Sequence, residues 1–157
     1  MFRWFLPTGG DGPPTEWQRP RVGIGTFGLG SARHDDEVSG ERDASLKYLI
    51  QLARAADSLG YEAVLTPTGA HCEDAWVVTA ALIAQTERLK FLVAFRPGLV
   101  APALTAHMAS TFQRLSGGRL LLNIVAGSSD AELRTYGDAA GHDERYARTG
   151  EFSRCRT

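Results

Sequence analysis

The sequence predicts an α/β fold in which parallel strands alternate with helices. Three apolar runs begin near Ala63, Phe91 and Leu120, roughly 30 residues apart, which is the usual repeat of a βαβ unit. The runs are apolar throughout instead of alternating, as expected for a parallel sheet that is covered on both faces. A doubly wound open sheet and a (β/α)8 barrel both fit this pattern. The chain of 157 residues has at most four strand–helix units, whereas a complete barrel takes about 250 residues.

The first element is a short strand over residues 3–7. Residues 8–43 are rich in glycine and proline and then become acidic, so we expect a surface loop that buries no core. The run Gly23–Gly28 matches the G-x-G-x-x-G string of dinucleotide-binding proteins. No helical pattern follows it before Ser45, so we interpret this run as loop as well.

Helical spacing begins after Ser45, with Gly60 as a stop signal. The apolar positions of this first helix are Leu46, Leu49, Ile50, Ala53 and Ala56. A short buried strand follows over residues 62–65. The apolar stripe predicted for the second helix consists of Trp76, Val77, Ala80, Ala81 and Ala84. Glu73 and Asp74 are expected in its first turn, where acidic groups suit the helix dipole.

The remaining elements follow the same alternation of strand and helix. Residues 91–95 are the next strand, and Pro102 suits the first position of a third helix. We expect one face of this helix to consist of Leu104, Met108, Thr111, Phe112 and Leu115. Gly117 and Gly118 end it, residues 120–125 form the last clear strand, and residues 143–152 open a fourth helix. The tail, residues 153–157, departs from the helical pattern.

Composition excludes several classes of protein. Apolar residues make up 43% and charged residues 22% of the chain, with a net charge of -1, which is typical of a globular domain. The balanced charge argues against a nucleic-acid binder or a polybasic membrane-surface protein, because both need clustered positive charge. Cys72 and Cys155 form no C-x-x-C pair, which argues against a disulfide scaffold or a metal site. The apolar start is too short for a signal peptide, and we expect a cytoplasmic protein.

Polar and small residues follow three successive strands, at the edge where parallel α/β proteins place their sites. Residues 66–74 bring together hydroxyls, an imidazole, a thiol and two carboxylates. Cys72 is expected beside a helix N-terminus, which lowers the pKa of a thiol; the alternative is a small packing residue. Arg96 is expected to meet an anion or a planar ring, or else to be a solvated turn residue. After the last strand, Asn123 and small residues either admit a ligand or form a plain turn.

Several of these segments resemble the alkanesulfonate monooxygenases of the bacterial luciferase-like, flavin-dependent family. The Cys-Glu-Asp-Ala-Trp run at 72–76, which follows Pro-Thr-Gly at 67–69, is the most specific. The other segments are Phe-Leu-Pro-Thr at 5–8, residues 55–61, residues 88–97, Leu-Ser-Gly-Gly-Arg at 115–119, and residues 123–128. The resemblance extends to about Phe152 and excludes the region from 21 to 43.

The resemblance implies the N-terminal half of a TIM-type (β/α)8 barrel over residues 1–157. It implies an enzyme that uses reduced FMN (FMNH2) and O2 to release sulfite and an aldehyde from alkanesulfonates. A separate NAD(P)H-dependent flavin reductase would supply the FMNH2, and a homo-oligomer is expected. Cys72 matches the family's active-site cysteine, which stabilises flavin or an intermediate. We expect the flavin contacts to be Thr66, Arg96, Asn123, Ala126, Gly127 and Ser128.

The chain departs from the family pattern in two respects. Gly9 stands where the family has a histidine, so any contact from that side chain is lost. The family's second half, which supplies the flavin phosphate site and a mobile loop, has no counterpart here. We therefore expect the 157-residue chain alone to be inactive on alkanesulfonates. The alternatives are another luciferase-like monooxygenase, a non-catalytic barrel fragment that associates with a partner, and a self-contained open-sheet domain.

Overall fold

The computed structural model describes residues 3–9, 44–127 and 129–154. The strands are β1 (Arg3–Phe5), β2 (Ala63–Thr66), β3 (Lys90–Phe95) and β4 (Leu120–Ile124). The helices are α1 (Leu46–Ser58), α2 (Ala75–Leu82), the 3-10 turn η2 (Ile83–Gln85), α3 (Pro102–Ser116), α4 (Asp130–Thr135) and α5 (His142–Arg154). Most of the predicted loop, the Gly23–Gly28 run and residues 155–157 lie outside the described residues.

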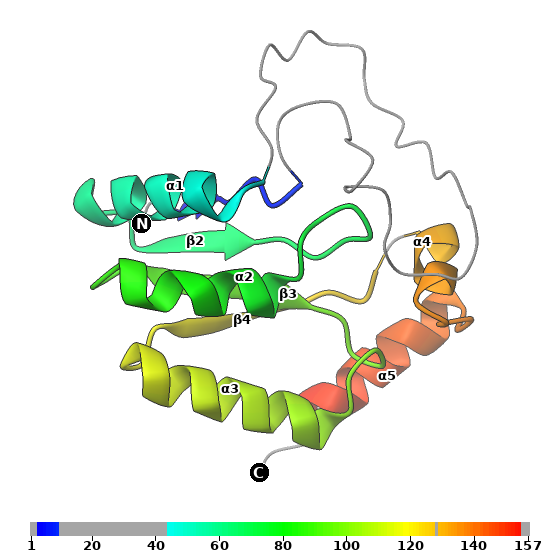
Figure 1. Ribbon diagram of the computed structural model, residues 1–157. Coiled ribbons are helices and arrows are strands. Elements are labelled where there is room, and N and C mark those ends of the chain that lie inside the picture. The colour runs from blue at the N-terminus through cyan, green and yellow to red at the C-terminus, as the bar shows by residue number, and fades with distance from the viewer. Residues whose placement is uncertain (1–2, 10–43, 128, 155–157) are drawn as a thin grey trace, which may run out of the picture.

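The four strands form one parallel sheet in the order β1-β2-β3-β4. Val64 pairs with Trp4 on one side and Phe91 on the other, and Phe91 pairs with Leu120. Successive right-handed crossovers that always step in one direction place their helices on one face, and α1, α2 and α3 lie side by side in this way (Figure 1). A doubly wound sheet reverses its strand order and has helices on both faces. The structure therefore confirms the barrel type.

The core lies between the sheet and this layer of helices. Its buried members are Leu6, Leu49, Ala53, Ala56, Val64, Ala75, Leu82, Leu89, Phe91, Val93, Phe112 and Leu120. The stripe predicted for α1 is confirmed at Leu49, Ala53 and Ala56, which are its buried residues. Ser45 begins α1 as predicted, because its hydroxyl accepts the N–H of Tyr48 at 3.3 Å, a standard N-cap contact.

The stripes predicted for α2 and α3 are wrong in part. The buried residues of α2 are Ala75, Thr79 and Leu82, whereas Val77 is 70% exposed. Almost every residue of α2 is apolar, so its periodicity has no phase and the packing decides which side faces the sheet. In α3 the predicted Phe112 is buried, but Leu104 and Leu115 are exposed.

Burial on both faces of the sheet, which the continuous apolar runs predicted, fails at β4. Its residues alternate between buried or half-buried and exposed, and Leu122 and Ile124 are 42% and 38% exposed. Among the described residues β1 and β4 each pair with one neighbour, so both edges of the sheet are open. Within the same residues, none of the helices has the length and apolar character of a membrane span.

The short helix α4 was not predicted, and it joins β4 to α5. Ser129 caps it by accepting the N–H of Glu132 at 3.2 Å. Arg145 of α5 is 1% exposed and pairs with Asp130 at 2.8 Å. The fourth predicted helix is confirmed as α5, which starts one residue earlier than residue 143 and ends two residues later than residue 152. Its ion pair with Asp130 fixes α4 against it, and α4 lies at the strand edge described below.

Candidate active site

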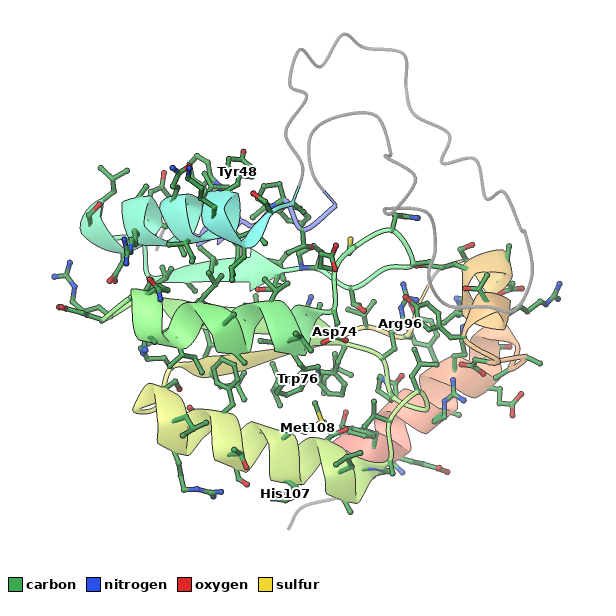
Figure 2. The ribbon with its side chains drawn as sticks, in the orientation of Figure 1. Tyr48, Asp74, Trp76, Arg96, His107 and Met108 are labelled. Carbon is green, nitrogen blue, oxygen red and sulfur yellow. The ribbon has the colours of Figure 1, made fainter. Side chains whose placement is uncertain are left out.

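A pocket of about 380 Å³ opens at the C-terminal ends of β2 and β3. Its walls come from the β2–α2 loop, the end of β3 with the turn after it, and the residue that follows α4. The lining residues are Thr8, Thr68, Gly69, Ala70, His71, Cys72, Glu73, Asp74, Ala75, Trp76, Ala94, Phe95, Arg96, Leu99, Val100 and Tyr136. Figure 2 shows Arg96 near α4 and Trp76 between α2 and α3. The predicted edge of the sheet therefore does carry a pocket of the size that ligands use.

The β2–α2 loop is held in place by three backbone and capping contacts. The N–H of Glu73 donates to the carbonyl oxygen of Thr8 at 3.0 Å, and the N–H of Cys72 donates to that of Gly69 at 3.1 Å. Asp74 caps α2 by accepting the N–H of Val77 at 2.9 Å, as expected for an acid at a helix start. These contacts fix the position of the Cys72 side chain in the pocket wall.

Cys72 is a half-buried free thiol, and its ionisation differs from the prediction. Burial raises the pKa of the Cys72 thiol; the Thr8 hydroxyl lowers it, and the Glu132 carboxylate raises it further. The predicted helix N-terminus does not offset burial, because Asp74 is the cap and Glu73 adds another negative charge. The expected thiolate is therefore wrong, and at neutral pH Cys72 carries its proton.

Arg96 is the buried charge of the pocket. Its side chain is 6% exposed, and its Nη2 donates to Oε2 of Glu132 at 2.9 Å. The other oxygen of Glu132 accepts the N–H of Ala70 at 2.7 Å. Glu132 therefore ties α4 both to β3 and to the β2–α2 loop that carries Cys72. The alternative that Arg96 is a solvated turn residue is excluded.

Arg96 has donors that this ion pair does not use. Its Nε and Nη1 atoms are buried and have no hydrogen-bond partner among the described residues. The ring of Tyr136 lies against the guanidinium, with its centroid 5.7 Å from Cζ, which suits a cation–π contact. Thr8 Oγ1 is likewise buried; it lies near enough to the Cys72 thiol to lower its pKa, but it has no hydrogen-bond partner by distance and angle among the described residues. Two residues of the pocket lining, Arg96 and Thr8, thus carry buried polar atoms without a partner among the described residues.

The opposite side of the pocket is apolar. Trp76 lies 6.1 Å from Phe95 between ring centroids, and Phe95 packs on Phe152 of α5 at 5.5 Å. Leu99 and Val100 complete this wall. A planar ligand with polar atoms on one edge matches the combination of an aromatic wall and a donor-rich wall.

The structure separates the predicted flavin contacts into two groups. Arg96 lines the pocket, as does Cys72, the predicted catalytic residue, whereas Thr66, Asn123, Ala126 and Gly127 do not. Thr66 is fully buried, and its hydroxyl accepts that of Thr79 in α2 at 3.0 Å. Thr66 thus faces the helix layer and supports the edge from behind. Ser128 lies outside the described residues.

The small residues after β4 are explained by packing within the chain. Gly127 adopts a φ of 87°, and a Cβ there would lie 2.9 Å from Leu133 Cδ1. The close approach that the small residues predicted is therefore made by Leu133 of α4. The Asn123 side chain is half-buried and makes no hydrogen bond to another described residue.

Sequence reasoning missed Glu132, Tyr136 and Thr8 as site residues. One signal was available for Glu132, since Ser129 and Glu132 have the S-x-x-E spacing of a capping box. Here the Glu132 side chain reaches Ala70 and Arg96 instead of the cap. No local pattern indicates such contacts, because Ala70 and Glu132 are 62 residues apart. Gly9, where the family pattern has histidine, borders the same loop: a Cβ there would lie 3.3 Å from the His71 carbonyl oxygen.

Comparisons with known proteins agree with this architecture. The luciferase-like monooxygenase family matches residues 21–155. The structure is similar to an EDTA monooxygenase from Chelativorans sp. BNC1, with a TM-score of 0.70 and 21% identity over 96% of this chain and 34% of that one. It is also similar to a long-chain alkane monooxygenase, with a TM-score of 0.63 and 21% identity over 69% of this chain and 30% of that one.

A third similar structure is the oxygenating constituent of 3,6-diketocamphane monooxygenase from Pseudomonas putida, in complex with FMN. Its TM-score is 0.58 and its identity 22%, over 69% of this chain and 32% of that one. The chain thus spans about a third of the length of these structures. At these identities the three likenesses show the fold, whereas the family match covers most of the sequence. The chain belongs to the luciferase-like monooxygenase family.

Proposed function

We propose that this chain is the flavin-binding N-terminal segment of a monooxygenase that acts on alkanesulfonates. The observation that carries the proposal is the pocket at the strand ends, where a buried arginine, a protonated thiol and an aromatic wall meet in a luciferase-like fold. All five residues of the Cys-Glu-Asp-Ala-Trp run at 72–76, which favoured alkanesulfonate monooxygenases, line this pocket. Reduced FMN from a separate NAD(P)H-dependent reductase is the proposed cofactor.

The residues of the pocket fit a reduced flavin. A flavin ring offers carbonyl oxygens and ring nitrogens as acceptors, which match the S–H of Cys72. Trp76 and Phe95 provide an apolar surface for a planar ring. When bound, reduced flavin would be the group that reacts with O2.

The chain's own residues would bind, orient and exclude water. The Glu132 carboxylate, through its contacts with the Ala70 N–H and with Arg96, holds Arg96 and the Cys72 loop in one geometry before any ligand enters. Fixed donors of this kind stabilise developing negative charge without reorganising during the reaction. The aromatic wall keeps water from that side of the pocket, which strengthens each polar contact inside it. Because its pKa is raised, Cys72 acts as a hydrogen-bond donor and not as a nucleophile.

Flavin binding tests the proposal at the level of this chain. FMNH2 would be titrated anaerobically into the purified protein while flavin fluorescence and absorbance are followed. Saturable binding is expected, and it should weaken when the wall residue Trp76 is changed to alanine. Val77→Ala is the matched control, because Val77 is 70% exposed on the same helix. Equal binding by both variants would place the flavin elsewhere.

A chimera tests the substrate. Residues 1–152 would replace the matching segment of an alkanesulfonate monooxygenase, and sulfite would be measured with a flavin reductase, NADPH, FMN and octanesulfonate. Sulfite release well above the reductase-only control supports the proposal. A chimera that folds and binds flavin but releases no sulfite contradicts it and favours another luciferase-like activity. The 157-residue chain assayed alone is expected to release none.

A further inference from the structure

Arg96, Thr8 and Cys72 give the polar side of the pocket several hydrogen-bond donors. Arg96 carries only donors, and a protonated thiol and a hydroxyl can each donate. Each oxygen of Glu132 already accepts one hydrogen bond, from Ala70 and from Arg96. Two acids line the pocket: Asp74 caps α2 through Oδ1, and Glu73 is the other. A ligand group that lies against Arg96, Thr8 and Cys72 would therefore be one that accepts hydrogen bonds.

Unsatisfied polar atoms concentrate at this pocket. Among the described residues, five buried side-chain nitrogen or oxygen atoms have no partner, and three of them belong to Thr8 and Arg96. The other two are the Nε atoms of Arg145 and Arg148 in α5. A buried donor without a partner destabilises a protein, and native proteins rarely leave one without a reason. These atoms mark the place where an acceptor would be bound most strongly.

We propose that Arg96 and Thr8 form a subsite for the oxyanion group of a ligand, such as a sulfonate, carboxylate or phosphate. Glu132 is the positioning residue of this subsite, because it occupies Nη2 and leaves Nε and Nη1 for the ligand. The apolar wall of Trp76 and Phe95 would take the remainder of the ligand. The inference rests on the proposed function, since that function requires a ligand with an acidic group in this pocket.

Alkylation of Cys72 reports occupancy of the subsite. The full chain would be treated with N-ethylmaleimide, and peptide mass spectrometry would follow Cys72 and Cys155 separately. Methanesulfonate is expected to slow alkylation of Cys72 by about tenfold, because a bound anion raises the pKa of the thiol and lowers the fraction of reactive thiolate. Alkylation of Cys155 should not change. Dimethyl sulfone, its uncharged analogue, should have little effect.

Variants separate the subsite from a general effect of salt. Arg96→Gln should abolish the protection. The double variant Arg96→Gln with Glu132→Gln removes both charges and keeps two amides in contact, so it serves if the single variant unfolds. Arg134→Gln is the matched control, since Arg134 is an exposed residue at the end of α4. Protection that persists in the folded double variant, or no protection in the unmodified protein, would overturn the proposal.

Further ligands distinguish the source of the oxyanion, and they separate the oxyanion subsite from the proposed function. Stronger protection by inorganic phosphate than by methanesulfonate assigns the subsite to the flavin phosphate, and the reverse order assigns it to the substrate. Riboflavin, which has no phosphate, tests flavin binding independently of the subsite. A protein that binds riboflavin but neither anion refutes the subsite and leaves the proposed function. A protein that binds an anion but no flavin refutes the proposed function and leaves the subsite.

Discussion

Replacing Glu132 by alanine should destabilise this chain more than any exposed acidic substitution. Glu132 is 14% exposed in its side chain and pairs with Arg96, which is 6% exposed. It also accepts the N–H of Ala70 at 2.7 Å, which joins α4 to the β2–α2 loop. The substitution removes all of these contacts and leaves a guanidinium buried without a counter-charge.

The magnitude follows from the burial of the pair. Removing one partner of a buried ion pair costs about 3–5 kcal/mol, because the remaining charge stays out of water. The lost acceptor of the Ala70 N–H is part of the same event and is not added to it. Since the total stability of a domain is about 5–15 kcal/mol, Glu132→Ala should lose a large fraction of it. Arg96→Met combined with Glu132→Gln should cost less, because that pair leaves no unpaired charge and retains an acceptor for Ala70.

Urea unfolding followed by far-ultraviolet circular dichroism measures these differences. Glu151→Ala is the control, since Glu151 is exposed on α5, and surface substitutions usually change stability by less than about 0.5 kcal/mol. A loss below about 1 kcal/mol for Glu132→Ala would refute the reasoning. A double variant less stable than the single one would show that the pair stabilises by charge and not by avoiding an unpaired charge.

Three further outcomes are expected. Burial raises the pKa of Asp57, but N–H bonds from residues 87–89 outweigh it and lower the pKa below 3.8. The stabilisation by the Asp57 carboxylate is thus present above that pH and is lost as pH falls through the folded-state pKa. In urea titrations Asp57→Asn should therefore be most destabilising near neutral pH, and its free energy of unfolding should approach that of the parent in acid. Cys72→Ser in the chimera should keep most sulfite release; complete loss with intact flavin binding would point to a nucleophile. Gly98→Ala should lower the melting temperature, because φ is 98°, a conformation that L side chains rarely adopt, and the Arg148 side chain would have to move away from the new Cβ; an unchanged temperature would contradict this strain.

The sequence alone determined the alternation of elements and most of their boundaries. Continuous apolar runs predicted β2, β3 and β4, and local signals predicted the helix ends, such as Ser45 before α1 and Gly117 after α3. These features depend on residues close in the chain, where capping, glycine conformation and periodicity act directly. The edge that carries the site was also predictable, because parallel strands all end on the same side.

Only the tertiary structure decided what the site contains. The apolar helix α2 has no phase of its own, so the sheet determined that Thr79 and not Val77 is buried. The ionisation of Cys72 depends on burial and on Glu132, which lies on a helix that the sequence did not predict. Glu132 meets Arg96 and Ala70 across 36 and 62 residues. Contacts over such separations arise from the order of strands in the sheet, and no local pattern encodes them.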